Sequence, residues 1–118
     1  MKKWFCVVSL LVVAVLALPA YAGQYGCIGT VTMVFINSNG VMVVSGPGGL
    51  PPIGLCSVNV GGGGVFSPDA CKVVYATLLA AKLSGQSAQI NFNDALTCST
   101  QPVWGGPTST SAWAVSTQ

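Results

Sequence analysis

Charged side chains are almost missing from this chain of 118 residues. It has no histidine, two acidic residues and four basic residues, and all four basic residues are lysines. Lys2 and Lys3 lie at the N-terminus, and the charges after residue 22 cancel: Asp69, Lys72, Lys82 and Asp94. A chain without a basic surface has little to attract phosphates. Nucleic-acid binding through counterion release is therefore disfavoured, and so is electrostatic attachment to anionic lipid.

The groups that perform acid, base or nucleophilic chemistry are equally scarce. Asp69 and Asp94 could act as the acid and base of a glycosidase, and Lys72 or Lys82 could act as an amine nucleophile. We instead assign Asp69 to a helix terminus and Asp94 to the turn after a strand, where both carboxylates have structural roles. Isolated lysines on a helix are typical of solvated ammonium groups on buried stems. We therefore expect a protein that is not an enzyme and has no cofactor.

The absence of histidine also bears on the cysteines. No two of them have C-x-x-C spacing, so metal ligation is disfavoured. Apart from Cys6, the cysteines number four, and an even count in a short exported chain is typical of disulfides. Three pairings are open. We favour Cys56–Cys71, which would join the predicted helix to the sheet, and Cys27–Cys98, which would join the first strand to the end of the strand after the helix.

Residues 1–22 have the pattern of a signal peptide. Met1-Lys2-Lys3 is basic, Trp4 to Leu18 is apolar, and Pro19 to Ala22 ends in an A-x-A cleavage site. A membrane anchor is the alternative, but the apolar run is shorter than the ~20 residues that span a bilayer. Gly23 follows the site, whereas a lipoprotein needs cysteine there. We expect cleavage after Ala22, a secreted or periplasmic product and no membrane insertion of the mature chain.

Alternating side chains predict the first half of the fold as strands. In Gly29–Ile36 one face carries Val31, Met33 and Phe35, as a half-buried strand requires. Turn residues 37–40 and the apolar run 41–44 then predict a hairpin. Residues 46–52 are too rich in glycine and proline for a helix or a central strand, so they predict a loop. Residues 55–60 alternate again and predict a third strand.

A helix is predicted from about residue 67 to 84. Ser67 suits the N-cap, Pro68 the first turn and Gly85 the left-handed position after the end. Its apolar residues surround much of the circumference, so we expect cover on more than one side. The run 88–93 alternates cleanly and predicts a strand, and 101–104 could add a short one. From residue 105 we expect a flexible tail, with an extra edge strand around Trp113 as the alternative.

These elements predict an α+β fold or a small β-barrel. From the elements alone we expect the barrel to be partly open, with the helix across one end. It would form one domain over residues 23–104, after the signal peptide 1–22 and before the flexible tail 105–118.

Two further features suggest binding surfaces. The run Gly61–Gly64 before a helix could hold a phosphate, but the phosphate-loop motif is absent and a flexible loop is the simpler interpretation. Tyr75, Trp104 and Trp113 could present flat apolar faces to sugar rings while asparagine and glutamine amides supply hydrogen bonds. Plain packing is the alternative for each ring.

Three stretches together resemble a known family. The run from Cys56 through Ser67 to Lys72, the helix end Leu79–Gly85 and the strand Gln89–Phe92 before Cys98 are similar to the binding subunits of pentameric bacterial toxins, especially the subtilase-cytotoxin B subunit. The resemblance covers residues 24–104. It implies an OB-like fold, which is a closed, five-stranded antiparallel barrel with one α-helix. It also implies pentamers whose helices line a pore, and outer faces that bind host glycans. It assigns no ligand-binding residue here.

The function we expect is therefore recognition. The leading hypothesis is an exported, oligomeric, glycan-recognising protein with a host glycan or protein partner. The alternative is a structural or interaction component of a bacterial envelope or secretion assembly, with the C-terminal tail as its docking segment.

Overall fold

A computed structural model of the chain describes residues 23–59, 64–107 and 111–118. The expected signal peptide and Gly61 to Gly63 lie outside the described residues. The described elements, with η for short 3-10 helices, are β1 (Gly23–Thr30), β2 (Met33–Ile36), β3 (Val41–Ser45), η1 (Pro47–Gly49), β4 (Ile53–Ser57), α1 (Pro68–Ser84), β5 (Ser87–Asp94), η2 (Cys98–Thr100) and β6 (Ala112–Thr117).

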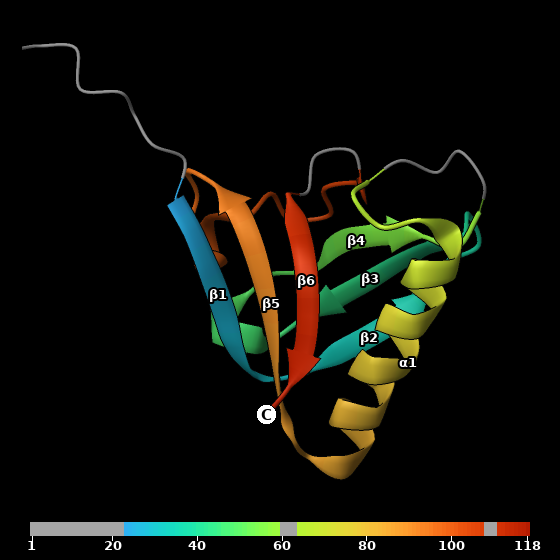
Figure 1. Cartoon of the computed structure of the whole chain (residues 1–118), viewed down its shortest axis with the longest axis horizontal. Coiled ribbons are helices and arrows are strands. Elements are labelled where there is room, and N and C mark those ends of the chain that lie inside the picture. Colours follow the sequence, from blue (N-terminus) through green and yellow to red (C-terminus); the bar gives the residue numbers. More distant parts are fainter. Residues whose placement is uncertain (1–22, 60–63, 108–110) are drawn as a thin grey trace, which may run out of the picture.

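Two antiparallel sheets face each other across the core (Figure 1). Sheet A has the strand order β1-β5-β6 and sheet B the order β2-β3-β4. The α+β class is confirmed. The expected closed barrel of five strands is not what the hydrogen bonds describe, because they divide six strands into two separate three-stranded sheets.

The chain changes sheets at Val31 and Thr32, inside the stretch expected to form one strand. Gly46 packs against this bend with φ of 116°, and a Cβ there would lie 2.4 Å from the carbonyl oxygen of Thr30. The break shifts the alternation of side chains. Val31 is buried as expected, but after the bend Val34 faces the core and Phe35 is exposed.

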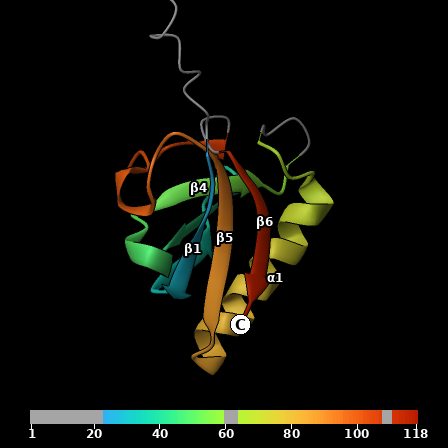
Figure 2. The same ribbon diagram turned by 60° about the vertical axis from the view of Figure 1, so that its left-hand side comes forward.

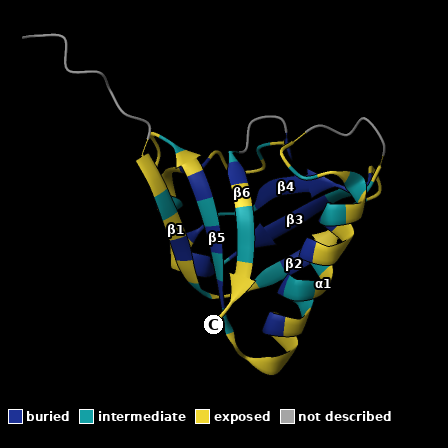
Figure 3. Ribbon diagram, viewed as in Figure 1, coloured by how far each residue is buried: buried dark blue, intermediate teal, exposed yellow. Residues whose placement is uncertain are grey.

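The helix forms where the sequence predicts it. The Ser67 hydroxyl accepts a hydrogen bond from the backbone N–H of Ala70, and Gly85 ends the helix with φ of 71°. One side of α1 is buried: Cys71, Val74, Leu78 and Ala81. The helix lies across the open side between β6 and β2 (Figures 1 and 2). On the next side Tyr75 and Leu79 are partly buried against the core, and among the described residues the remaining side of the helix is exposed (Figure 3).

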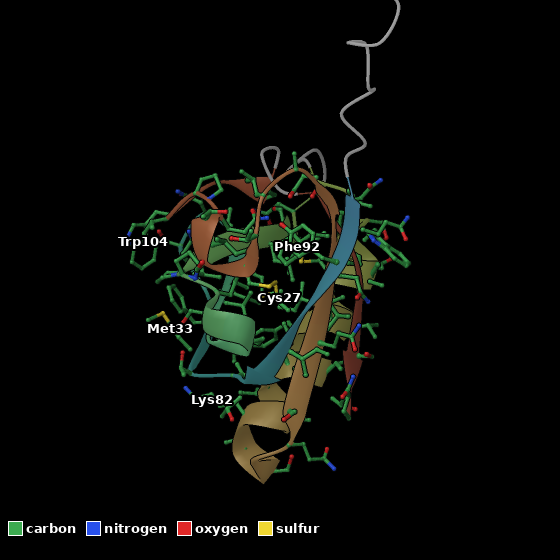
Figure 4. All side chains as sticks on the ribbon, turned by 90° about the vertical axis from the view of Figure 1, so that its left-hand side faces the viewer. Cys27, Met33, Lys82, Phe92 and Trp104 are labelled. Carbon is green, nitrogen blue, oxygen red and sulfur yellow. A yellow bond between two sulfur atoms is a disulfide. The ribbon has the colours of Figure 1, made fainter. Side chains whose placement is uncertain are left out.

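The predicted disulfide pairing is confirmed. Cys56–Cys71 joins β4 to α1, and Cys27–Cys98 joins β1 to η2. On the side opposite the helix, η1 packs against β1 and η2. Cys27 and Phe92 lie between the two layers, as Figure 4 shows. Each disulfide therefore anchors a non-strand element to one side of the core.

The C-terminal region differs most from expectation. Residues 112–117, expected in a flexible tail, form β6 and pair with β5 from Ala88 to Phe92. That expectation is wrong for these residues, and the alternative of an edge strand holds. Residues 101–104 are not a strand; they form a turn in which the Gly105 N–H donates to the Pro102 carbonyl at 3.0 Å.

Candidate functional site

The Asp94 carboxylate is the centre of a hydrogen-bond network at the end of β5. Oδ1 accepts from the Tyr25 hydroxyl at 2.7 Å and from the Leu96 N–H at 2.8 Å. Oδ2 accepts from Gln101 Nε2 at 3.0 Å and from the Ser111 hydroxyl. Gln101 also donates to the Tyr25 oxygen at 2.6 Å. The network therefore joins β1, β5, the segment after η2 and the residue before β6.

Both ionisable members of the network have shifted pKa values. Burial raises the pKa of Asp94, but the hydrogen bonds from Ser111, Tyr25, Gln101 and Leu96 outweigh it, and the net pKa is lowered. Burial and the hydrogen bond to Asp94 raise the pKa of Tyr25 to about 12. The Tyr25 ring also stacks on Phe92, with centroids 5.5 Å apart. Asp94 is therefore a charged acceptor whose hydrogen bonds hold the fold together.

The other charged candidates lie on α1. Asp69 accepts from the Lys72 ammonium at 3.2 Å, and both side chains are exposed. Asp69 lies in the first turn of the helix and Lys82 in the last, where each charge suits the helix dipole. The structure assigns Asp69 and Asp94 to different interactions, and in the described residues no cluster of three or more metal-ligating side chains occurs.

The outer face of sheet A carries uncharged amides, together with Ile28, which pairs with Gln89 and is 49% exposed. Gln24, Asn91 and Asn93 alternate with core residues, and Gln89 donates to the Asn91 amide oxygen at 2.7 Å. A Cβ at Gly26 would lie 2.7 Å from Gln89 Nε2, so these amides lie across the bare backbone of β1. Below, the "amide face" means these residues: Gln24, Gly26, Gln89, Asn91 and Asn93.

The three expected aromatic residues have different surroundings. Tyr75 is half-buried and packs against the core. Trp113 is 47% exposed and lies in β6 at a register shift beside Asn91, so it adjoins the amide face. Trp104 is 64% exposed and lies in the turn after η2. Two indoles thus remain available to a ligand, and they lie on different parts of the surface.

Trp104 has a left-handed backbone with φ of 58°, which is unusual for a bulky residue. Its N–H donates to the Pro52 carbonyl at 2.7 Å, and the Gly54 N–H donates to the Gly105 carbonyl at 2.7 Å. These bonds hold the turn against β4. In Figure 4, Trp104 and Met33 lie on the side of the molecule away from β1 and β5.

No protein-family model, curated protein or solved structure matches this chain. Within residues 23–59, 64–107 and 111–118, no helix is both long enough and apolar enough to cross a membrane. The two disulfides are typical of proteins from oxidising compartments.

Sequence reasoning missed several residues of these surfaces. Tyr25 and Gln101 are separated by 76 positions, and no local pattern connects them to Asp94. The amide face had a signal, because the 88–93 run alternates amides with apolar residues. The alternation of side chains predicts Phe35 in the core. That prediction is wrong, because the bend that reverses the direction of Phe35 depends on Gly46, which is distant in sequence.

Proposed function

We propose that this protein is an exported, non-enzymatic binding protein that recognises uncharged glycans through the amide face and Trp113. The observation that carries the proposal is the combination of neutral amides on one sheet face with an exposed indole at the register shift in the neighbouring strand β6. Sugar hydroxyls need donors and acceptors without charge, and the apolar C–H face of a sugar ring packs on a flat aromatic surface.

The remaining chemistry of the chain supports binding over catalysis. Both carboxylate oxygens of Asp94 already accept hydrogen bonds, and Asp69 forms an ion pair with Lys72 on the solvent-exposed surface. A general acid or base needs a carboxyl group that is free to exchange a proton with a substrate.

The connectivity supports the resemblance to toxin binding subunits. If β1 and β2 are counted as two halves of one strand bent at Val31, five strands result, and α1 lies between the third and the fourth. That order is the one expected of an OB-like barrel. A ring of subunits would also give a partner to the exposed side of α1, where Val73 and Leu83 lie.

The proposal is tested by screening the exported protein against neutral and sialylated glycans, then measuring the affinity of the best ligand for variants. We expect Trp113→Ala and Asn91→Ala each to weaken binding by about tenfold, a loss of about 1.4 kcal/mol. Trp104→Ala is the matched control, because it removes an exposed indole elsewhere. A blank screen, or equal losses in all three variants, would contradict the proposed site.

The second candidate function is a component of a bacterial envelope or secretion assembly. The exposed apolar side of α1 favours it, with Leu83 79% exposed. The docking segment would then be the helix, because β6 is occupied by its pairing with β5. Crosslinking in the producing cell, with and without Leu83→Ser, separates the two: only this function predicts a specific envelope partner that the substitution removes.

A further inference from the structure

The first residue of β1 lies beside the end of β5 that carries Asp94. Gly23 and Asp94 are cross-strand partners in the antiparallel pairing of β1 with β5, the two strands that run side by side in Figure 1. Opposite residues in such a pair have Cα atoms about 4.5–5.5 Å apart and share one face of the sheet. The backbone nitrogen of Gly23 is therefore a close neighbour of the Asp94 carboxylate.

The hydrogen bonds of Asp94 leave its negative charge without a cation. All the donors are uncharged: three side-chain groups and one backbone N–H. The lysines of the described residues, Lys72 and Lys82, lie on α1, and the ion pair there joins Lys72 to Asp69. A cation within about 4–6 Å favours the charged form of a carboxyl group. The described side chains do not provide one to Asp94.

Removal of the signal peptide creates a cation at this position. The sequence predicts cleavage after Ala22, which makes Gly23 the first residue of the mature chain. Before cleavage, the nitrogen of Gly23 belongs to a neutral peptide bond. After cleavage it is an α-amino group, and α-amino groups are largely protonated at neutral pH.

We propose that signal-peptide cleavage completes the Asp94 network, because the new α-ammonium group of Gly23 forms an ion pair with the Asp94 carboxylate. Gly23 is exposed, and a Cβ built on it would have no heavy atom within 4 Å. The ammonium group therefore stays hydrated, and its attraction to Asp94 is that of an exposed pair, which salt screens. The processed chain gains a stabilising interaction that the precursor lacks.

The inference goes beyond the proposed function and depends on no ligand; it rests on the predicted cleavage site. Tyr25 is the other titratable group that faces Asp94, and it reaches the carboxylate from β1. Its pKa is raised to about 12, so it stays neutral where an α-amino group titrates. Near neutral pH, the charges that meet at this end of sheet A are therefore those of Gly23 and Asp94.

The test is the rate at which an amine-reactive reagent labels Gly23 in the exported protein at neutral pH, read by peptide mass spectrometry. The reagent attacks the uncharged amine, so an ion pair that retains the proton slows labelling. We expect Asp94→Asn to accelerate labelling of Gly23 by about two- to fivefold, the effect of an exposed ion pair. Lys82 in the same sample is the internal reference and should keep its rate.

Two controls separate the charge of Asp94 from its structural role. Asp69→Asn removes the exposed carboxylate on α1 and should leave the labelling rate of Gly23 unchanged. In about 1 M salt, where the Debye length is about 3 Å, the difference between Asp94→Asn and the unaltered protein should largely disappear. Faster labelling that persists in salt would mean that the substitution only loosens the strand end, and the inference would be wrong. A mature chain that begins at a residue other than Gly23 would also overturn it.

A second measurement needs no substitution and so guards against a variant that fails to fold. Acetylation of the Gly23 α-amino group removes its charge and leaves Asp94 in place. In an NMR titration, the pKa of the Asp94 carboxyl should be higher in the acetylated protein than in the unmodified protein. Equal pKa values would contradict the ion pair.

These measurements are independent of the glycan screen. If the ion pair is found and no glycan binds, the inference stands and the proposed function is wrong. If glycans bind through the amide face but the labelling rate of Gly23 does not respond to Asp94→Asn, the proposed function stands and the inference is wrong.

Discussion

Replacing Asp94 with asparagine is the sharpest test of what that carboxylate does. The substitution keeps the size of the side chain but exchanges one acceptor oxygen for an NH2 donor. Each carboxylate oxygen now accepts two hydrogen bonds. If the amide group faces Gln101, two donors oppose each other, and the buried Gln101 amide loses one of its two acceptors and keeps only the Tyr25 oxygen.

The expected cost follows from those bonds. A hydrogen bond to a charged group contributes about 1.5–3 kcal/mol, and a buried donor without an acceptor adds to the loss. We expect Asp94→Asn to lower the free energy of unfolding by about 2–3 kcal/mol. With a urea dependence of about 1 kcal/mol per molar for a small domain, the urea midpoint should fall by about 2 M or more.

The assay is urea unfolding followed by tryptophan fluorescence, with the disulfides intact. Because the folded pKa of Asp94 is lowered, its stabilisation is present above the unfolded value near 4 and is lost as pH falls through the folded value. The difference between the two proteins should therefore shrink in acid. Asp69→Asn is the control, since that carboxylate is exposed. A loss below about 0.5 kcal/mol at pH 7 would refute the reasoning.

Three further predictions concern stability. Removing the β1–η2 disulfide, which spans 71 residues, should lower the free energy of unfolding by about 4.4 kcal/mol. Removing the β4–α1 disulfide, which spans 15 residues, should lower it by about 3 kcal/mol. If calorimetry of the two double Cys→Ala variants gives the reverse order, the loop-entropy argument is wrong. The pKa of Tyr25 is raised to about 12, so the contribution of Tyr25 to folding stability is complete below pH 10.0 and is lost between pH 10.0 and pH 12. In Tyr25→Phe this alkaline loss of stability should be absent when unfolding is measured as a function of pH. Gly46→Ala should destabilise the folded protein by about 2 kcal/mol or more, because the positive φ and the close contact with Thr30 both disfavour a Cβ. A stable, well-expressed variant would show that the bend can move.

Local chemistry made the helix, β5 and the disulfides predictable. Ser67, Pro68 and Gly85 have fixed preferences at helix ends, which act within a few residues. The amides of β5 alternate with its core residues at the period of a half-buried strand. The cysteine pairing was one of three that the sequence left open, and it was favoured because each bond would join elements that are expected to be neighbours in the fold.

The features that could not be predicted from the sequence depend on contacts between residues that are far apart in the chain. The bend at Val31 depends on Gly46, and it turns Phe35 from the expected core to the surface. The polar composition around β6 resembles a flexible tail, yet Ala112 and Val115 find partners on β5. The role of Asp94 was hidden for the same reason, since its hydrogen-bond donors come from four separate parts of the chain.

The unlike outer faces of the two sheets have a consequence for behaviour at interfaces. The side of sheet A is rich in uncharged amides, with Ile28 and Trp113 exposed among them, and the side with β2 and the Trp104 turn carries an indole, a phenyl ring and aliphatic groups. A rigid particle with this division is an amphiphile on the scale of a whole domain. At an air–water or oil–water boundary it should adsorb in one orientation, with β2 and the Trp104 turn toward the apolar phase, and lower the surface tension without unfolding.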